Sequence, residues 1–204
     1  MDTFKNKYRI PSARLQNWDY GSPGLYFITI CTKNREHFFG EIIDDEMIVN
    51  KLGLITNSEW EKTPQIRPDM NLELGEFVVM PNHFHGIVMI GENKFNSENT
   101  MNINGTNNTG INVMRRDAMH GVSTNQNTDA AAKNKFGPQS KNLGSIIRGF
   151  KSSVTTFAGK NNIAFEWQER FHDHIIRNHD EYLRISNYIL NNPANWKGDK
   201  FFKE

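Results

Sequence analysis

The sequence predicts an α+β domain in which helices pack on an antiparallel sheet of the ferredoxin-like type. Strand-like runs occupy residues 25–32, 72–80 and 83–90, and helical spacing appears both between and after them. The full order is strand, hairpin, helix, two strands, helix, strand, helix. A ferredoxin-like sheet with the helices on one face is the simplest architecture that satisfies this order.

The first half of the chain supplies the hairpin and the first helix. Residues 25–32 are β-branched and aromatic, and they follow the turn sequence Gly-Ser-Pro-Gly at 21–24. Residues 38–50 predict a short hairpin. Residues 51–62 predict a helix that ends before Pro64.

The second half of the chain is mainly helical. Apolar residues recur at helical spacing from Leu143 to Phe157, which predicts a helix with one buried stripe. Residues 170–177 predict a strand. Residues 180–191 predict a final helix, which Pro193 closes.

A length of 204 residues is enough for a single domain with a substantial core, so we expect residues 1–204 to form one domain. An insertion at about 92–142 interrupts it. This segment is crowded with Asn, Thr and Gly and shows no hydrophobic period, which predicts a disordered or loosely ordered loop.

Composition indicates the compartment. The single cysteine, Cys31, excludes an internal disulfide framework and favours a reducing environment. The N-terminal sequence contains no apolar run typical of a signal peptide, and no stretch approaches the roughly 20 apolar residues of a membrane span. We therefore expect a cytoplasmic protein without a membrane partner.

The formal net charge is only +1, but the charge is unevenly distributed. Residues 1–40 and 143–178 are rich in Lys and Arg, whereas residues 41–82 are strongly acidic. A polyanion would contact the two basic segments and avoid the acidic one. Uneven charge is also typical of an ordinary solvated surface, so this pattern alone does not identify a nucleic-acid partner.

The strand at 83–90 begins with His83-Phe84-His85. Because side chains alternate between the faces of a strand, both imidazoles point one way while Phe84 enters the core. This arrangement provides two neutral metal ligands, although two satisfied surface histidines are an equally good explanation of the triplet alone.

A second His-x-His sequence, His172-Asp173-His174, competes with the first. If both of its histidines faced solvent, Asp173 would have to face the core, so we prefer the first pair. His174 remains a candidate for contacting a phosphate or supporting the site.

The last helix carries Tyr188 and Asn192. Residues four apart share one helix face at about 6 Å, so a phenol and a carboxamide would reach the same place. Two imidazoles and one amide oxygen, without a thiolate, suit Mg²⁺ or Mn²⁺. Tyr188 is then the candidate nucleophile for cutting a phosphodiester bond, because Tyr182 faces nearly the opposite side of the helix.

These residues stand in stretches that resemble the single-tyrosine HUH transposases of the IS200-like type, most closely the REP-associated tyrosine transposases. The matching stretches are RLQNWDYGSPGLYFITICTKNR (14–35), EFVVMPNHFHGIVMI (76–90), SIIRGFKSSVTT (145–156), WQERFHDHIIR (167–177) and NYILNNP (187–193). The Asn-rich insertion at about 92–142 departs from the family pattern.

The resemblance implies a metal-dependent single-stranded DNA endonuclease and strand transferase that forms a 5′-phosphotyrosine intermediate. On that pattern His83, His85 and Asn192 match the metal ligands and Tyr188 matches the nucleophile. The implied partner is single-stranded or hairpin DNA, and the family contains both monomers and homodimers. The alternative is a catalytically idle, hairpin-DNA-binding regulatory protein derived from a transposase.

Basic side chains near these stretches are candidates for contacting DNA phosphates. They flank the first strand, lie on the solvent side of the helix after the insertion, or belong to the second histidine pair. The candidates are Arg14, Lys33, Arg35, Arg148, Lys151 and His174.

Overall fold

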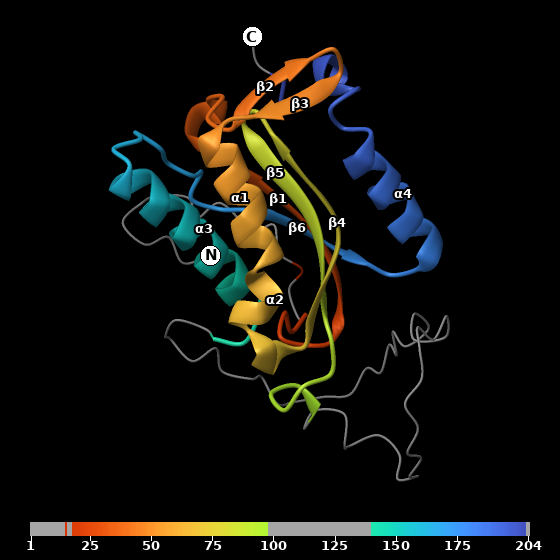
Figure 1. The fold of residues 1–204 in the computed structure, drawn as a ribbon. Helices are drawn as coiled ribbons and strands as arrows, with labels where there is room; N and C mark the ends of the chain where they lie inside the picture. The colour runs from red at the N-terminus through yellow and green to blue at the C-terminus, as the bar shows by residue number, and fades with distance from the viewer. Residues whose placement is uncertain (1–14, 16–17, 98–139, 203–204) are drawn as a thin grey trace, which may run out of the picture.

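The structure is a computed structural model that describes residue 15, residues 18–97 and residues 140–202 (Figure 1). Its central element is a four-stranded antiparallel sheet in the order β4-β5-β1-β6, accompanied by a separate two-stranded hairpin. The strands are β1 (Gly24–Cys31), β2 (Gly40–Ile43), β3 (Glu46–Val49), β4 (Leu72–Met80), β5 (His83–Ile90) and β6 (His172–Ile176).

The helices follow the predicted order along the chain. They are α1 (Lys51–Glu61), the short α2 (Thr63–Ile66), α3 (Leu143–Lys160) and α4 (His179–Leu190), with short 3₁₀ turns at Lys33–Arg35, Pro68–Met70 and Trp196–Gly198. None of the helices in the described part of the chain is long and apolar enough to cross a membrane.

The predicted ferredoxin-like class is confirmed. Leaving out the β2-β3 hairpin, the chain runs β1-α1-β4-β5-α3-β6, and the first strand lies at the centre between the third and fourth strands of that series. Every neighbouring pair in the sheet is antiparallel. The β-α-β crossovers place α1 and α3 on the same face (Figure 1).

The expectation that all helices lie on one face is wrong, because α4 covers the opposite face of the sheet (Figure 1). Ile185 and Ile189 of α4 pack against Ile87 of β5. Side chains alternate along β5, so Ile87 emerges on the face opposite Phe84. The sheet therefore has two covered faces rather than one.

The larger core lies between the sheet and the pair α1 and α3. Trp60 of α1, Phe84 of β5 and Phe150 of α3 form an aromatic triangle, with ring centroids 4.9, 5.1 and 5.1 Å apart. All three are buried. Their separations suit tilted and edge-to-face packing, and each such pair adds about 0.5–1.5 kcal/mol beyond the area that it buries.

Three asparagines begin the three long helices. The side chains of Asn50, Asn142 and Asn178 accept hydrogen bonds from backbone N–H groups in the first turns of α1, α3 and α4. Each cap is worth about 1 kcal/mol. The cap at Asn178 also fixes where α4 starts, and with it the position of Tyr188 in the last turn of the helix.

The chain after α4 folds back over the start of β5. Trp196 and Phe201 form a small buried cluster with Met80, and Cys31 and Phe202 pack at its edge. This C-terminal segment covers the sheet face that carries His83. The predicted insertion lies largely outside the described residues, which resume at residue 140.

Candidate active site

Strand β5 places His83 and His85 on the sheet face opposite Phe84, as the alternation predicts. Their relative exposures are 0% and 1%, so both imidazoles are buried under α4 and the C-terminal segment. The ring centroids lie 4.5 Å apart. A pair of satisfied surface histidines is therefore excluded.

The hydrogen bonds of Asn82 determine which ring nitrogen of His83 carries the proton. The Asn82 amide nitrogen donates to the carbonyl oxygens of Arg35 and Phe201, at 3.2 and 2.9 Å. Its oxygen therefore faces His83 Nδ1, 2.9 Å away, and can only accept a hydrogen bond from an Nδ1–H group. In the neutral ring, Nε2 of His83 then carries the lone pair.

His85 is held at both ring nitrogens. Thr29 on β1, its register partner, places Oγ1 2.8 Å from Nδ1. Nε2 lies 3.1 Å from the hydroxyl of Tyr188. The ring is therefore oriented with Nε2 toward α4.

Both histidines are neutral at neutral pH. Burial lowers the pKa of His83 to about 3, and the nearby Asn192 side chain acts in the opposite direction. Burial also lowers the pKa of His85 well below its usual value, and the adjacent His83 adds to this effect. A neutral imidazole is the form that coordinates a metal ion.

Helix α4 and the residues that follow it bring Tyr188 and Asn192 to the histidines. Asn192 lies two residues beyond the end of α4 and is 2% exposed, whereas Tyr188 is 39% exposed. Burial, followed by the charge of Asp199, raises the pKa of Tyr188. The phenol is therefore protonated at neutral pH in the absence of a nearby cation.

The structure adds Asp199, a residue that sequence reasoning missed. Its Oδ2 accepts hydrogen bonds from the Tyr188 hydroxyl at 3.1 Å and from the Asn192 amide nitrogen at 3.0 Å. Asp199 is the only carboxylate between Glu181 and Glu204. That isolation was the one indication available in the sequence, because the residue stands in an irregular segment without periodicity.

The side chains at this site fit a metal ion. Ligand atoms of His83, His85 and Asp199 all lie within 4.8 Å of one another. His83 Nε2 and Asn192 Oδ1 are buried without a hydrogen-bond partner among the described residues. Each such orphaned atom costs about 1–3 kcal/mol, and an ion bound between them would satisfy both.

A cavity of about 560 Å³ opens beside these groups. Its lining includes Tyr188, Asn192 and Asp199, residues of the β2-β3 hairpin, and other residues of the C-terminal segment. The nucleophile candidate therefore faces an open space large enough for a substrate group.

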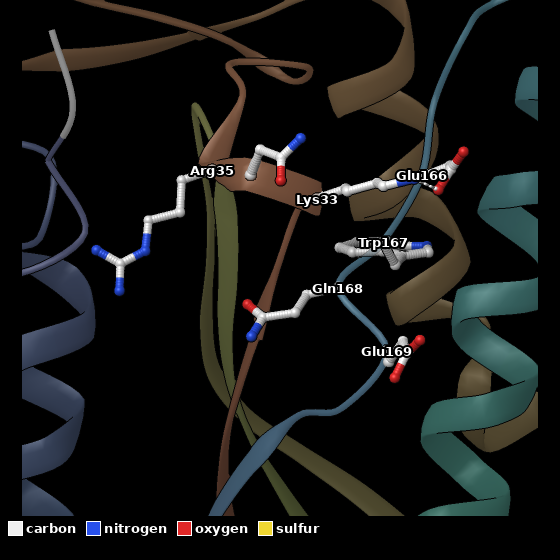
Figure 2. Close-up of a pocket in the computed structure, with 7 residues that line it drawn as sticks. Lys33, Arg35, Glu166, Trp167, Gln168 and Glu169 are labelled. Atoms are coloured by element: carbon white, nitrogen blue, oxygen red, sulfur yellow. Dashed lines mark hydrogen bonds and ion pairs between the residues drawn. The ribbon is translucent and has the colours of Figure 1, made fainter.

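A second cavity of about 500 Å³ involves two of the predicted DNA contacts, Lys33 and Arg35. Lys33 forms an ion pair with Glu166, and Figure 2 shows Arg35 pointing away from that pair. Arg35 donates to the carbonyl oxygen of Lys200 at 2.9 Å and lies 5.2 Å from the centre of the Phe201 ring. Arg35 thus lies beside the histidine site, whereas the charge of Lys33 is offset.

The other predicted DNA contacts are dispersed. Arg148 is exposed and Lys151 is half-buried on α3, on the sheet face away from the histidines, and Lys151 donates to the carbonyl oxygen of Gln168 at 2.5 Å. His174 lies 2.7 Å from a carboxylate oxygen of Glu181 instead of joining the site. Arg14 lies outside the described residues.

Comparison with known proteins identifies a relative. No protein-family model matches the chain. An uncharacterised protein of Haemophilus influenzae strain Rd is 38% identical over 192 residues, which are 94% of this chain and 92% of that protein. The two chains belong to one family.

A comparison with solved structures supports the fold of this chain. The solved structure of a REP-associated tyrosine transposase bound to a REP hairpin aligns over 92% of this chain and 76% of that chain, at 19% identity and a TM-score of 0.50. The resemblance predicted from the sequence is confirmed at the level of the fold. What the site does must still be argued from its own side chains.

Proposed function

We propose that the chain is a metal-dependent enzyme that nicks and rejoins single-stranded DNA through a 5′-phosphotyrosine at Tyr188. The observation that carries the proposal is the position of the Tyr188 hydroxyl, 3.1 Å from His85 Nε2 and 3.1 Å from Asp199 Oδ2. A phenol among buried imidazoles, an amide and a carboxylate has the composition of a covalent phosphoryl-transfer site.

In this proposal His83, His85 and Asn192 hold a divalent ion, Mg²⁺ or Mn²⁺. His83 Nε2 and Asn192 Oδ1 support this assignment because they are buried and lack other partners within the described chain. The ion supplies a Lewis acid that polarises the scissile phosphate. Both imidazoles are neutral and oriented in advance by Asn82 and Thr29.

Tyr188 performs the cutting step. As its oxygen bonds to phosphorus, its proton passes to Asp199 Oδ2, which already lies within hydrogen-bond distance. The bond from phosphorus to the 3′ oxygen breaks, and that oxygen takes a proton from solvent to become a free 3′-hydroxyl, while Asp199 later returns its own proton to solvent. Rejoining is the reverse attack by a 3′-hydroxyl on the phosphotyrosine, which conserves the energy of the bond.

Hairpin DNA is the proposed partner, since the REP-associated transposase that shares this fold was solved with a REP hairpin. Among the basic candidates, Arg35 is best placed to meet the phosphate next to the scissile one, because it packs on Phe201 beside His83. Arg14, Lys33, Arg148, Lys151 and His174 remain proposed contacts for more distant phosphates.

A covalent-capture assay tests the proposal. The protein is incubated with a labelled oligonucleotide carrying a hairpin and single-stranded flanks, with Mn²⁺, and run on a denaturing gel. We expect a protein–DNA band that disappears in Tyr188→Phe and persists in the matched variant Tyr182→Phe.

Each other result has a definite meaning. A band that persists in Tyr188→Phe would remove Tyr188 from the mechanism. Hairpin binding without a covalent band in any variant would overturn the enzymatic proposal in favour of an idle hairpin-binding protein.

A further inference from the structure

The cavity beside Tyr188 has a definite position relative to the reaction. Its lining includes the site residues Tyr188, Asn192 and Asp199, together with Ile42 and Phe202. A phosphodiester attacked by Tyr188 carries one nucleotide on each side. One of those two nucleotides must therefore lie at the mouth of this cavity.

The charge of the cavity argues against a phosphate inside it. The carboxylates of Asp45 and Asp199 face a single cation, Lys197. With the scissile phosphate at the proposed divalent ion, these side chains leave no net positive charge in the cavity to attract a second phosphate. A neutral group of the flanking nucleotide, its base, is the better occupant.

Phe202 gives the cavity lining an aromatic surface on which a base can stack. Phe202 is half-buried, and its ring meets the buried indole of Trp196 edge-on at 5.4 Å and 75°. The indole fixes the orientation of the Phe202 ring and leaves part of it exposed to the cavity. The volume of about 560 Å³ accepts a purine or a pyrimidine with its sugar.

We propose that this cavity is a nucleobase pocket, in which a base flanking the scissile phosphate leaves the DNA stack and packs on Phe202. The proposal rests on the proposed function, because it takes the position of the scissile phosphate from Tyr188. Stacking on an aromatic side chain tolerates any base. The pocket would therefore hold the strand at the cleavage position, but stacking on Phe202 would not by itself select one base over another.

The test asks whether removing the base and removing the Phe202 ring weaken DNA binding independently of each other. Binding of a hairpin oligonucleotide is measured for the wild-type protein and Phe202→Ala, with an abasic site placed in turn at each single-stranded position. At one position we expect base removal to weaken wild-type binding roughly tenfold, about 1.4 kcal/mol, and to change Phe202→Ala binding little. A 2-aminopurine at that position should change its fluorescence on binding to the wild type only.

Two further variants keep this test decisive. Phe202→Leu retains apolar packing and should show an intermediate coupling if Phe202→Ala unfolds. Phe95→Ala removes an exposed phenylalanine at the far end of β5 and should behave as wild type.

The outcomes separate the pocket from the chemistry, because the covalent-capture assay runs in parallel. The pocket proposal is overturned if base removal at every position weakens DNA binding equally in the wild type and in Phe202→Ala. This holds even if the covalent band forms. Coupling at one position without any covalent band supports the pocket and contradicts the proposed catalysis. Failure to bind the oligonucleotide contradicts both.

Discussion

The two faces of the central sheet differ although they share the same strands. On one face of β5, Phe84 packs among the rings of Trp60 and Phe150. On the other face, His83 and His85, the immediate neighbours of Phe84, lie equally buried among polar groups. The first face is mainly apolar, and the indole nitrogen of Trp60 is its one buried side-chain polar atom without a hydrogen-bond partner among the described residues. The second face holds His83 Nε2 and Asn192 Oδ1, two such atoms that can both bind a metal ion.

This difference shows how one strand separates stability from chemistry. Alternation sends every second residue to the apolar core, so the neighbouring residues can carry buried imidazoles at fixed spacing. The polar face is less stable on its own, because desolvated groups without partners cost free energy. We infer that a metal ion completes this face, which leads to four ways of testing the contrast.

The largest effect is expected from His83→Ala combined with His85→Ala. The double variant should lose the Mn²⁺-stimulated covalent band down to background. It should also lose the rise in melting temperature on adding Mn²⁺, which for wild type at one hundred times the dissociation constant corresponds to about 2.7 kcal/mol. The exposed His172 of the second pair provides the control, since His172→Ala should keep both properties. An unchanged Mn²⁺ shift in the first variant would show that the metal assignment is wrong.

A substitution on the apolar face should lower the stability of the fold and leave metal binding unchanged. Phe84 is fully buried, so Phe84→Ala should lower the free energy of unfolding by about 3–5 kcal/mol, measured by urea denaturation. The fraction that remains folded should retain its Mn²⁺ shift. Leu54→Ala, at a residue that is 57% exposed, should change stability by less than about 0.5 kcal/mol. If Phe84→Ala lowers the free energy of unfolding no more than Leu54→Ala does, the proposal that the apolar face provides stability is wrong.

The pH dependence of stability should come from the polar face. The pKa of His83 is lowered to about 3 in the folded protein and is about 6.5 in the unfolded protein. Above pH 6.5 the imidazole is neutral in both states, so protonation takes nothing from the stability. As the pH falls below 6.5 only the unfolded state takes up the proton, and the free energy of unfolding decreases. Without metal, His83 alone should lower the free energy of unfolding by roughly 2 kcal/mol between pH 6.5 and pH 5. His83→Gln should remove that part of the slope. Identical slopes in the two proteins would contradict the burial of His83.

The smallest effect is expected from replacing residues 98–139 with a short Gly/Ser linker. The described ranges already contain all four strands of the sheet and the helices on both faces. Shortening a loop changes its closure entropy only slowly, so stability should change by about 1 kcal/mol. Loss of cooperative unfolding would show that this segment belongs to the domain core.

The sequence predicts much of the fold because local patterns determine it. The strands at 72–80 and 83–90 are found at the predicted bounds, since Pro81-Asn82 separates two clear strand patterns. Tyr188 and Asn192 were paired by helical spacing. The structure brings them together although Asn192 lies beyond the end of α4, because Asp199 accepts hydrogen bonds from both.

The remaining features depend on contacts between distant parts of the chain. No local pattern indicates that α4 covers the second sheet face, or that Glu166 offsets Lys33 across 133 residues. Asp199 was missed for the same reason, since only the folding back of the C-terminal segment places it beside Tyr188. Local periodicity identifies elements and candidate ligands, whereas the tertiary fold decides which of them meet.

The central proposal is that the Tyr188 hydroxyl attacks a DNA phosphate at the sheet face that carries His83 and His85. The most direct measurement is peptide mapping of the Mn²⁺-dependent covalent complex by tandem mass spectrometry after nuclease digestion. We expect the residual nucleotide on Tyr188, attached through its 5′ phosphate. Attachment to any other residue, or through a 3′ phosphate, would contradict the account.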